Sequence, residues 1–210
     1  MTAVGRPPTR TAILDAVDRL LGVLGYHKLT VDDVAQAAGI SRRTFYLHFA
    51  GKEEATLACL DRNIARLVEE LRRLAREPGP ARLRLEAMLR FRVRFLHETA
   101  RHRQDVNDEI FGQLRPLYMP RRERYLAAES AVFAEVLEEG RREGGLRFDD
   151  ARETALLLLL ATNAFMPFGL SPRQMRRRAE IERRVGRMVE LLLRGLDAVG
   201  ASPEKERSGR

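Results

Sequence analysis

The stretch "TVDDVAQAAGISRRTFYLHF" (residues 30–49) carries the most specific structural signal in this 210-residue chain. Its apolar residues recur at helical spacing in two short segments, and Gly39 separates the two. Two short helices joined by a tight turn form a helix-turn-helix. The stretch therefore predicts a first helix over 31–38 and a second over 42–49.

Each predicted helix begins at a hydroxyl residue. Thr30 precedes the first helix and Ser41 precedes the second, and such side chains accept hydrogen bonds from the free N–H groups of a first turn. Asp33 lies three residues after Thr30, a spacing close to that of a capping box. In the simplest interpretation these residues are ordinary helix caps.

The second helix has two distinct faces. Phe45 and Phe49 are four residues apart, share one face and are expected to pack inward. Arg42 and Tyr46 share another face, and Arg43 lies beside them. Two arginines at a helix start oppose the helix macrodipole, which favours acids there. A negatively charged partner outside the chain would offset that cost.

Cations and hydroxyls around this helix suit DNA. A recognition helix lies in the major groove and contacts base edges through its N-terminal residues. Helix N-termini bind phosphate through free N–H groups, and Thr30, Ser41 and Lys52 each lie at or next to a helix start. His48 could donate a further hydrogen bond to the DNA backbone. Singly, Lys52 is as well explained by a solvated charge, but together these residues predict a DNA-binding surface.

Residues 11–60 resemble the DNA-binding domain of the TetR family of bacterial transcriptional repressors. The matching elements, in chain order, are Gly25, Thr30, Asp33-Val34-Ala35, Ala38-Gly39-Ile40-Ser41, Thr44-Phe45-Tyr46, His48-Phe49 and Lys52-Glu53. Arg43 departs from the family pattern, because members often have a small residue there.

The resemblance implies a two-domain, all-helical, Ω-shaped homodimer that binds a roughly palindromic operator in double-stranded DNA. A ligand pocket in the C-terminal domain would control the separation of the two recognition helices. The residues implied to face bases and adjacent phosphates are Arg42, Arg43, Thr44 and Tyr46. Those implied to hold the DNA backbone are Thr30, Ser41, His48 and Lys52.

The composition is that of an ordinary globular protein with an excess of positive charge. The chain has 44% hydrophobic residues and a formal net charge of +8, with its basic residues spread along its length. That charge favours an acidic partner such as nucleic acid. The single cysteine, Cys59, excludes an internal disulfide. Because the chain has no signal-peptide pattern and no bilayer-spanning apolar run, we expect a cytoplasmic protein without membrane contacts.

Strand signals are almost absent, which predicts an all-α fold. We expect an N-terminal three-helix DNA-binding domain over 1–50 and a larger ligand-binding and dimerisation domain over 51–200, whose residues 51–76 form a connecting helix. Residues 201–210 are expected to be a disordered tail. The other helices are expected over 9–24, 81–101, 105–114, from Pro116 or Pro120 to 142, 150–167 and 171–199.

The segment "ALLLLLATNAFMPFG" (155–169) is apolar on nearly every side, so its helix is expected to be buried all round. The last helix carries an apolar stripe formed by Ile181, Val185, Met188, Val189, Leu192 and Leu196. One explanation is a central core helix in a monomer. The family resemblance favours the other, a four-helix interface between two copies of the chain.

Aromatic and methionine residues of the larger domain could line a pocket for a hydrophobic effector, and an acyl-CoA would suit the basic surroundings. The candidates are Met88, Phe91, Phe95, Phe111, Tyr118, Tyr125, Phe133, Asn163 and Met166. At helical spacing the same residue types also form plain core. Asn163 is the exception, because a buried amide needs a hydrogen-bond partner, whether a ligand, the other subunit or a backbone carbonyl.

No arrangement of residues supports catalysis, a cofactor or a metal. His97 and His102 in "HETARH" are five residues apart, about 140° around a helix, and so do not share one face as zinc-protease histidines do. We therefore expect a DNA-binding transcriptional repressor that a small hydrophobic ligand releases. The alternative is an effector-independent architectural or cell-division protein on the same scaffold, and the sequence does not separate a repressor from an activator.

Overall fold

A computed structural model describes residues 9–100, 112–166, 170, 172–175 and 177–198. These residues form helices and no β-strand apart from one isolated bridge between Leu146 and Asp197, which confirms the all-α prediction. The helices are α1 (Thr9–Lys28), α2 (Val31–Ala38), α3 (Arg42–Tyr46), α4 (Lys52–Ala75), α5 (Ala81–Ala100), α7 (Arg115–Arg142), α8 (Ala151–Thr162), a 3-10 turn η1 (Asn163–Phe165), α9 (Pro172–Met175) and α10 (Arg178–Arg194).

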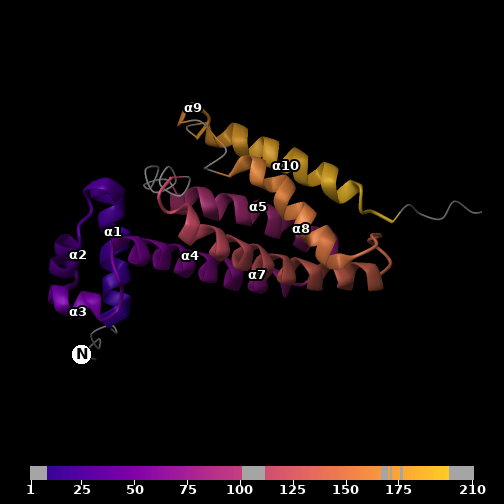
Figure 1. Cartoon of the computed structure of the whole chain (residues 1–210). Helices are drawn as coiled ribbons and strands as arrows, with labels where there is room; N and C mark the ends of the chain where they lie inside the picture. Colours follow the sequence, from indigo (N-terminus) through magenta and orange to yellow (C-terminus); the bar gives the residue numbers. More distant parts are fainter. Residues whose placement is uncertain (1–8, 101–111, 167–169, 171, 176, 199–210) are drawn as a thin grey trace, which may run out of the picture.

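Helices α1, α2 and α3 form a small unit at one end of the molecule, from which α4 leads into the remaining helices (Figure 1). We call α1–α3 the N-terminal bundle, and α5 and α7–α10 the C-terminal bundle. Two separate hydrophobic clusters correspond to them. The N-terminal cluster includes Ala55, Ala58 and Cys59 of α4, so α4 contributes to both cores.

Two glycines shape the N-terminal bundle. Gly25 has φ 76° and interrupts α1, which continues to Lys28 instead of ending at residue 24 as expected. Gly39 ends α2 with φ 67° and ψ 39°, the left-handed conformation that glycine adopts without steric cost. The N–H of Ile40 then donates to the carbonyl of Ala35 at 3.0 Å. This closes the turn between α2 and α3.

Helix α3 is shorter than predicted, since it ends at Tyr46 rather than at residue 49. The chain still turns in the helical sense, because the N–H of His48 donates to the carbonyl of Phe45 at 2.9 Å and that of Phe49 to the same oxygen at 3.1 Å. Phe49 is therefore buried beside Phe45 although it lies outside the helix. A five-residue helix is too short to be stable alone, so tertiary packing sets its end.

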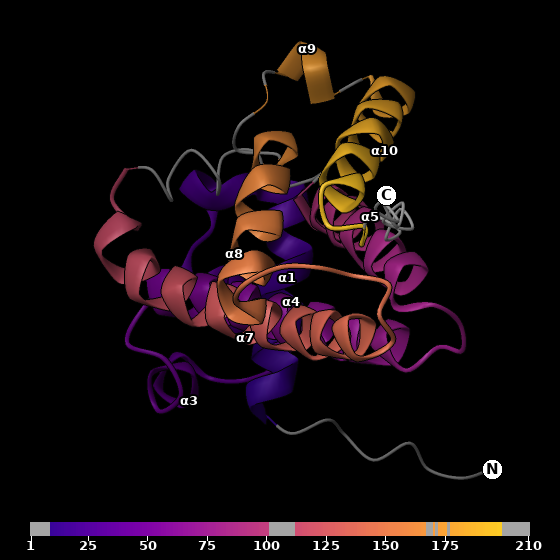
Figure 2. The same ribbon diagram turned by 90° about the vertical axis from the view of Figure 1, so that its right-hand side faces the viewer.

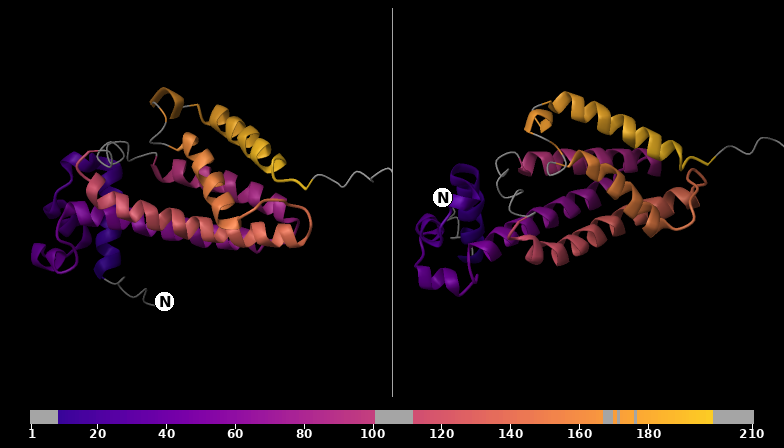
Figure 3. Two further views of the ribbon diagram at one scale, coloured as in Figure 1. Left: turned by 45° about the vertical axis from the view of Figure 1, so that its right-hand side comes forward. Right: turned by 45° about the horizontal axis from the view of Figure 1, so that its top comes forward.

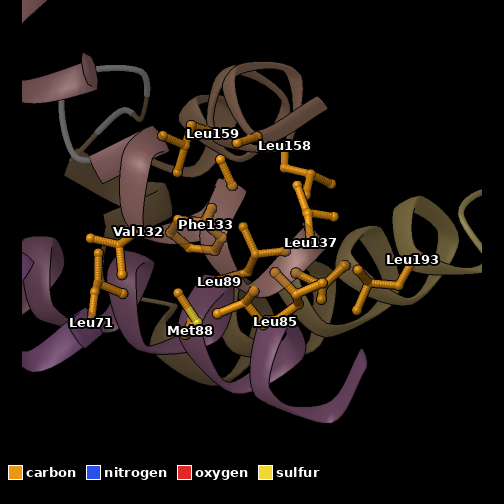
Figure 4. Close-up of a cluster of buried hydrophobic side chains, with 14 of the residues drawn as sticks. Leu71, Leu85, Met88, Leu89, Val132, Phe133, Leu137, Leu158, Leu159 and Leu193 are labelled. Atoms are coloured by element: carbon orange, nitrogen blue, oxygen red, sulfur yellow. The ribbon is translucent and has the colours of Figure 1, made fainter. Parts of the chain in front are cut away.

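Helices α5, α7, α8 and α10 of the C-terminal bundle pack together with the later part of α4. Helices α4 and α7 run side by side, α8 crosses α7, and α10 lies over α5 (Figures 1, 2 and 3). Its core is filled by aliphatic side chains that surround Phe133 (Figure 4). Residues labelled there include Leu71 of α4, Met88 of α5, Leu137 of α7 and Leu159 of α8.

Three predicted helix boundaries need correction or lie outside the described residues. The helix expected over 150–167 ends at Thr162 and continues as the 3-10 turn η1. The helix expected over 171–199 is divided into α9 and α10. The short helix expected over 105–114 falls largely on residues 101–111, which lie outside the description.

The apolar faces of α8 and α10 differ from the prediction. Leu157 and Leu160 of α8 are 56% and 42% exposed, so this helix is not buried all round within one chain. In α10 the predicted stripe turns toward the chain's own core, where Ile181, Val185 and Val189 are buried. The outward residues of these helices, not that stripe, are thus available to a partner.

None of the helices in the described ranges is long and apolar enough to cross a bilayer.

Candidate nucleic-acid interface

Hydroxyl caps define the starts of α2 and α3. Thr30 and Asp33 form a complete capping box: the N–H of Asp33 donates to Thr30 Oγ1 at 3.2 Å, and the N–H of Thr30 donates to Asp33 Oδ2 at 3.0 Å. Ser41 Oγ accepts from the N–H of Thr44 at 3.0 Å and lies 2.9 Å from Thr44 Oγ1. A cap satisfies one of four free N–H groups, so other first-turn donors remain for an external anion.

The inward and outward faces of α3 follow the predicted division. Phe45 is fully buried, Phe49 is almost so, and their ring centroids are 5.9 Å apart. Tyr46 stands edge-on to Phe45 with centroids 5.6 Å apart, and it is 49% exposed. The buried ring of Phe45 anchors the backbone next to Tyr46, so the tyrosine is held on the outward face of α3.

Arg42 and Arg43 are exposed at the start of α3. Arg42 Nε lies 3.1 Å from Asp32 Oδ1 on α2, and both side chains are more than half exposed. A hydrogen bond with Tyr46, and then the charge of Asp32, raise the pKa of Arg42 above its usual value. Asp32 was not predicted as a partner of Arg42. Its position in the first turn of α2 indicates an acid that stabilises the helix, but it does not indicate which residue Asp32 contacts in the tertiary structure.

Lys52 makes contacts within the chain, in addition to the DNA-backbone contact predicted for it. Its Nζ donates to the carbonyl of Tyr26 at 3.1 Å and to that of His27 at 3.5 Å, and it lies 4.6 Å from the centroid of the Tyr26 ring. The ammonium therefore binds the C-terminal end of α1, where the helix dipole favours a cation. Its predicted phosphate contact stays a prediction.

Two further residues complete the charged surroundings of α3. His48 is exposed just after the helix. The Arg10 guanidinium lies 5.1 Å from the centroid of the Phe49 ring, a cation–π distance. Arg10 was not predicted as a site residue, since only the fold brings the start of α1 next to the end of α3. The surface around α3 thus combines exposed cations with capped helix starts, which is the chemistry that phosphate backbones bind.

Neighbouring residues of α4 hold the two bundles together. Asp61 accepts hydrogen bonds from Tyr125 Oη at 2.6 Å and Arg121 Nε at 3.3 Å, both on α7. Arg62 donates to Asp15 Oδ1 at 2.5 Å and to the carbonyl of Leu14 at 3.2 Å, both on α1. Two adjacent residues of α4 thus contact α7 on one side and α1 on the other.

A buried polar network crosses the C-terminal bundle. Arg92 of α5 and Glu129 of α7 form an ion pair with 3% of each side chain exposed. Arg92 Nη1 donates to Thr162 Oγ1 at 3.2 Å, and Arg92 Nη2 donates to Asn163 Oδ1 at 3.1 Å. Arg92 is thus a protein partner for the Asn163 amide. The carboxylate of Glu129 neutralises the buried guanidinium of Arg92. The ion pair and the hydrogen bond to Thr162 then link α5 with α7 and α8.

The predicted ligand-lining residues do not form one group. Met88, Phe133 and Met166 are buried in the core of the C-terminal bundle, and Phe91 and Phe95 pack at its margin. Tyr118 instead packs on the N-terminal cluster, and burial raises its pKa. Tyr125 binds Asp61, and burial followed by this hydrogen bond raises its pKa. Phe111 lies outside the described residues.

Two buried polar atoms on α4 have no hydrogen-bond partner in the structure. They are Thr56 Oγ1 and Asn63 Nδ2, and the two residues are 0% and 5% exposed. Seven residues separate them, so they lie on one side of the helix. A buried donor without a partner costs about 1–3 kcal/mol. These atoms were not predicted, because burial of this side of α4 comes from helix packing.

One histidine of the "HETARH" segment makes a hydrogen-bond contact in the structure. His97 Nε2 lies 2.6 Å from the carbonyl oxygen of Phe165, and His102 is outside the description. Among residues 9–100, 112–166 and 177–198, no group of three or more His, Cys, Asp or Glu side chains could hold a metal.

A helix-turn-helix with an exposed second helix, joined through a long helix to an all-helical bundle, defines a two-part helix-turn-helix protein. Residues 13–59 match the family model described as bacterial regulatory proteins, tetR family. The similarity to this family thus covers α1–α3 and the start of α4.

A relative and a solved structure are also similar to this chain. The chain is 35% identical over 82 residues to the HTH-type transcriptional activator FasR of Mycolicibacterium smegmatis, covering 39% of this chain and 37% of FasR. It spans about a third of the length of that relative. A crystal structure of a transcriptional regulator from Cytophaga hutchinsonii has a TM-score of 0.73 at 14% identity, covering 89% of this chain and 97% of that one.

A second similar structure was solved with a bound molecule. It is the transcriptional regulator FadR from Bacillus subtilis in complex with stearoyl-CoA, with a TM-score of 0.65, 18% identity and coverage of 88% of this chain and 98% of FadR. At 18% identity, this similarity shows that the two proteins share a fold and no more than that.

Proposed function

We propose that this protein is a dimeric transcriptional regulator that inserts α3 into the major groove of double-stranded DNA. The observation that carries the proposal is the outward face of α3, where Arg42, Arg43 and Tyr46 are exposed above the buried Phe45. Thr30, Ser41, His48 and Lys52 surround this face and are proposed to hold phosphates. Thr44, next to the Ser41 cap, is proposed to contact a base or phosphate.

The proposed dimer forms through α8 and α10. Exposed large apolar residues on these helices support this: Leu157, Leu160 and Leu191 are 56%, 42% and 69% exposed. Two-fold pairing would bury them and present two copies of α3 to a roughly palindromic operator. Measuring the molecular mass by light scattering tests this step, and a monomer at micromolar concentration would contradict it.

The proposed effector is a small hydrophobic molecule bound in the C-terminal bundle, and an acyl-CoA is the first class to test. The stearoyl-CoA complex of FadR supports this choice. So do the apolar residues of the bundle and the unpaired amide donor of Asn63. The thioester carbonyl at the end of an acyl chain would supply the acceptor that this donor lacks.

The effector would act by shifting populations. It can weaken DNA binding only as far as its affinity differs between the DNA-binding conformation and another one. The contacts of Asp61 with α7 and of Arg62 with α1 support a physical connection between the bundles. Repression with release by ligand is our proposal for the direction of control, although the relative FasR is named as an activator.

Selection of bound duplexes from a random pool tests the DNA-binding function. The full-length protein is expected to enrich a palindromic sequence. Arg43→Ala should weaken binding to it by about 5- to 150-fold, the worth of about 1–3 kcal/mol. The matched control is Arg124→Ala, an exposed arginine on α7, which should leave the affinity unchanged. Binding should also fall steeply with salt. No enriched sequence, or equal effects of the two variants, would refute the proposal.

Titration of the selected complex with acyl-CoA thioesters of increasing chain length tests the effector. Loss of DNA binding with one chain length, and not with free coenzyme A, is expected. If no acyl-CoA binds the free protein and none changes DNA affinity, the effector-independent alternative is favoured.

A further inference from the structure

Leu47 is an exposed apolar residue directly after the last residue of α3. Its side chain is 75% exposed, compared with 49% for the neighbouring Tyr46. A single exposed leucine is ordinary on a protein surface. The position of this one relative to the buried face of α3 is what distinguishes it.

Leu47 points away from the protein, on the side of the helix opposite the buried Phe45. Its φ of −71° and ψ of −18° are helical, and its N–H donates to the carbonyl of Arg43 at 3.2 Å. Successive helical residues are rotated by about 100°, so Leu47 lies about 160° from Phe45. By the same rotation Arg43 is only about 40° away. Leu47 and Arg43 therefore occupy the centre of the outward face.

The surroundings favour DNA over a protein as the partner of Leu47. Arg42, Arg43 and His48 are all exposed beside it. A second copy docking here would bring two arginine-rich faces together, which like-charge repulsion opposes. DNA supplies the complementary negative charge. In its major groove the thymine C5-methyl is the apolar group that side chains contact.

We propose that Leu47 contacts a thymine methyl group and so determines specificity for a T·A pair in each half of the operator. The proposal rests on the proposed DNA-binding function. Arg43 lies one turn earlier on the same face, so the base that Leu47 contacts should neighbour the one that Arg43 contacts. A leucine has no hydrogen-bonding group, so the methyl is the feature it can recognise.

Replacement of thymine by deoxyuridine tests the contact, because it removes the methyl and leaves base pairing intact. In the duplex selected by the wild-type protein, each thymine is replaced singly and affinities are measured by fluorescence anisotropy. At one position in each half-site the affinity should fall about fourfold, the value of one buried methyl group. Leu47→Ala should bind the thymine duplex more weakly and show no difference between thymine and deoxyuridine at that position.

Leu83→Ala is the matched control, since Leu83 is a 57% exposed leucine on α5. It should keep the fourfold difference. If deoxyuridine has no effect at any position, or if Leu47→Ala retains the wild-type difference, the contact is refuted. Those outcomes leave the proposed DNA-binding function standing, because that function is tested separately, by selection of a sequence and by the comparison of Arg43→Ala with Arg124→Ala. The wild-type measurements do not depend on how the variant folds.

Discussion

Two arginine–carboxylate pairs show how differently the two bundles use charge. Arg42 and Asp32 meet on the N-terminal bundle with 61% and 63% of their side chains exposed, whereas Arg92 and Glu129 meet inside the C-terminal bundle with 3% exposed each. Water screens the first pair, so it holds little free energy and its arginine can exchange partners. The second pair has lost its hydration, so each charge depends on the other. An exposed arginine is thus available to DNA, and a buried one is committed to the fold.

The largest expected effect comes from removing one buried charge. Glu129→Ala should lower the free energy of unfolding by about 3–5 kcal/mol, because it leaves Arg92 buried and unpaired. Urea denaturation measures this. Glu138→Ala is the control, because Glu138 pairs with Arg141 on the surface of the same helix and should cost under about 1 kcal/mol. The double change Arg92→Met with Glu129→Leu should recover most of the loss; equal instability of the single and double variants would contradict a charge-based cause.

The contacts of Asp61 with α7 are intermediate in exposure between the exposed Arg42–Asp32 pair and the buried Arg92–Glu129 pair. Asp61→Ala should cost about 1–3 kcal/mol of stability, because Tyr125 and Arg121 lose their shared acceptor. If this contact also couples the bundles, the variant should respond less to an effector while its effector-free DNA affinity stays near wild type. Denaturation and DNA titrations with and without effector measure the two parts. An unchanged response would place the coupling elsewhere.

The pH dependence of the free energy of unfolding tests whether Cys59 is buried in the N-terminal core. Burial raises the pKa of its thiol from 9.0 to about 12, so above pH 9 the unfolded chain loses this proton while the folded chain keeps it. This contribution to stability is complete below pH 9 and is lost as the pH rises toward 12. Between pH 8 and pH 10 the wild type should lose about 1.4 kcal/mol more stability than Cys59→Ala. Denaturation at both pH values measures this, and equal losses would show that the thiol is not buried as described.

The smallest expected effect is that of the exposed pair. Asp32→Asn removes a negative charge beside the proposed DNA surface and frees Arg42 from its intramolecular partner. Affinity for the selected duplex should rise about twofold to tenfold at low salt, less at high salt, with a nearly unchanged denaturation midpoint. Glu86→Gln on α5 removes a partly exposed carboxylate from another ion pair and should not change affinity. A large loss of stability in Asp32→Asn would show that the two pairs are less different than their exposure indicates.

The helix-turn-helix was predictable because its signals are local. The capping box of Thr30 and Asp33, the glycine turn at Gly39 and the inward pair Phe45 and Phe49 each join residues three to four apart or depend on one residue. The C-terminal bundle was less predictable. Arg92 and Glu129 are 37 residues apart, and Arg92 and Asn163 are 71 apart. No local spacing indicates these partners.

Helical periodicity and capping act within a few residues, so the all-α fold, the helix-turn-helix and the outward position of Arg42, Arg43 and Tyr46 follow from the sequence. The end of α3 at Tyr46, the binding of Lys52 to the end of α1 and the inward direction of the apolar stripe of α10 follow from tertiary packing. These features depend on which helices come to lie together. Burial and partner choice are properties of the packed chain, since they follow from contacts between residues distant in sequence.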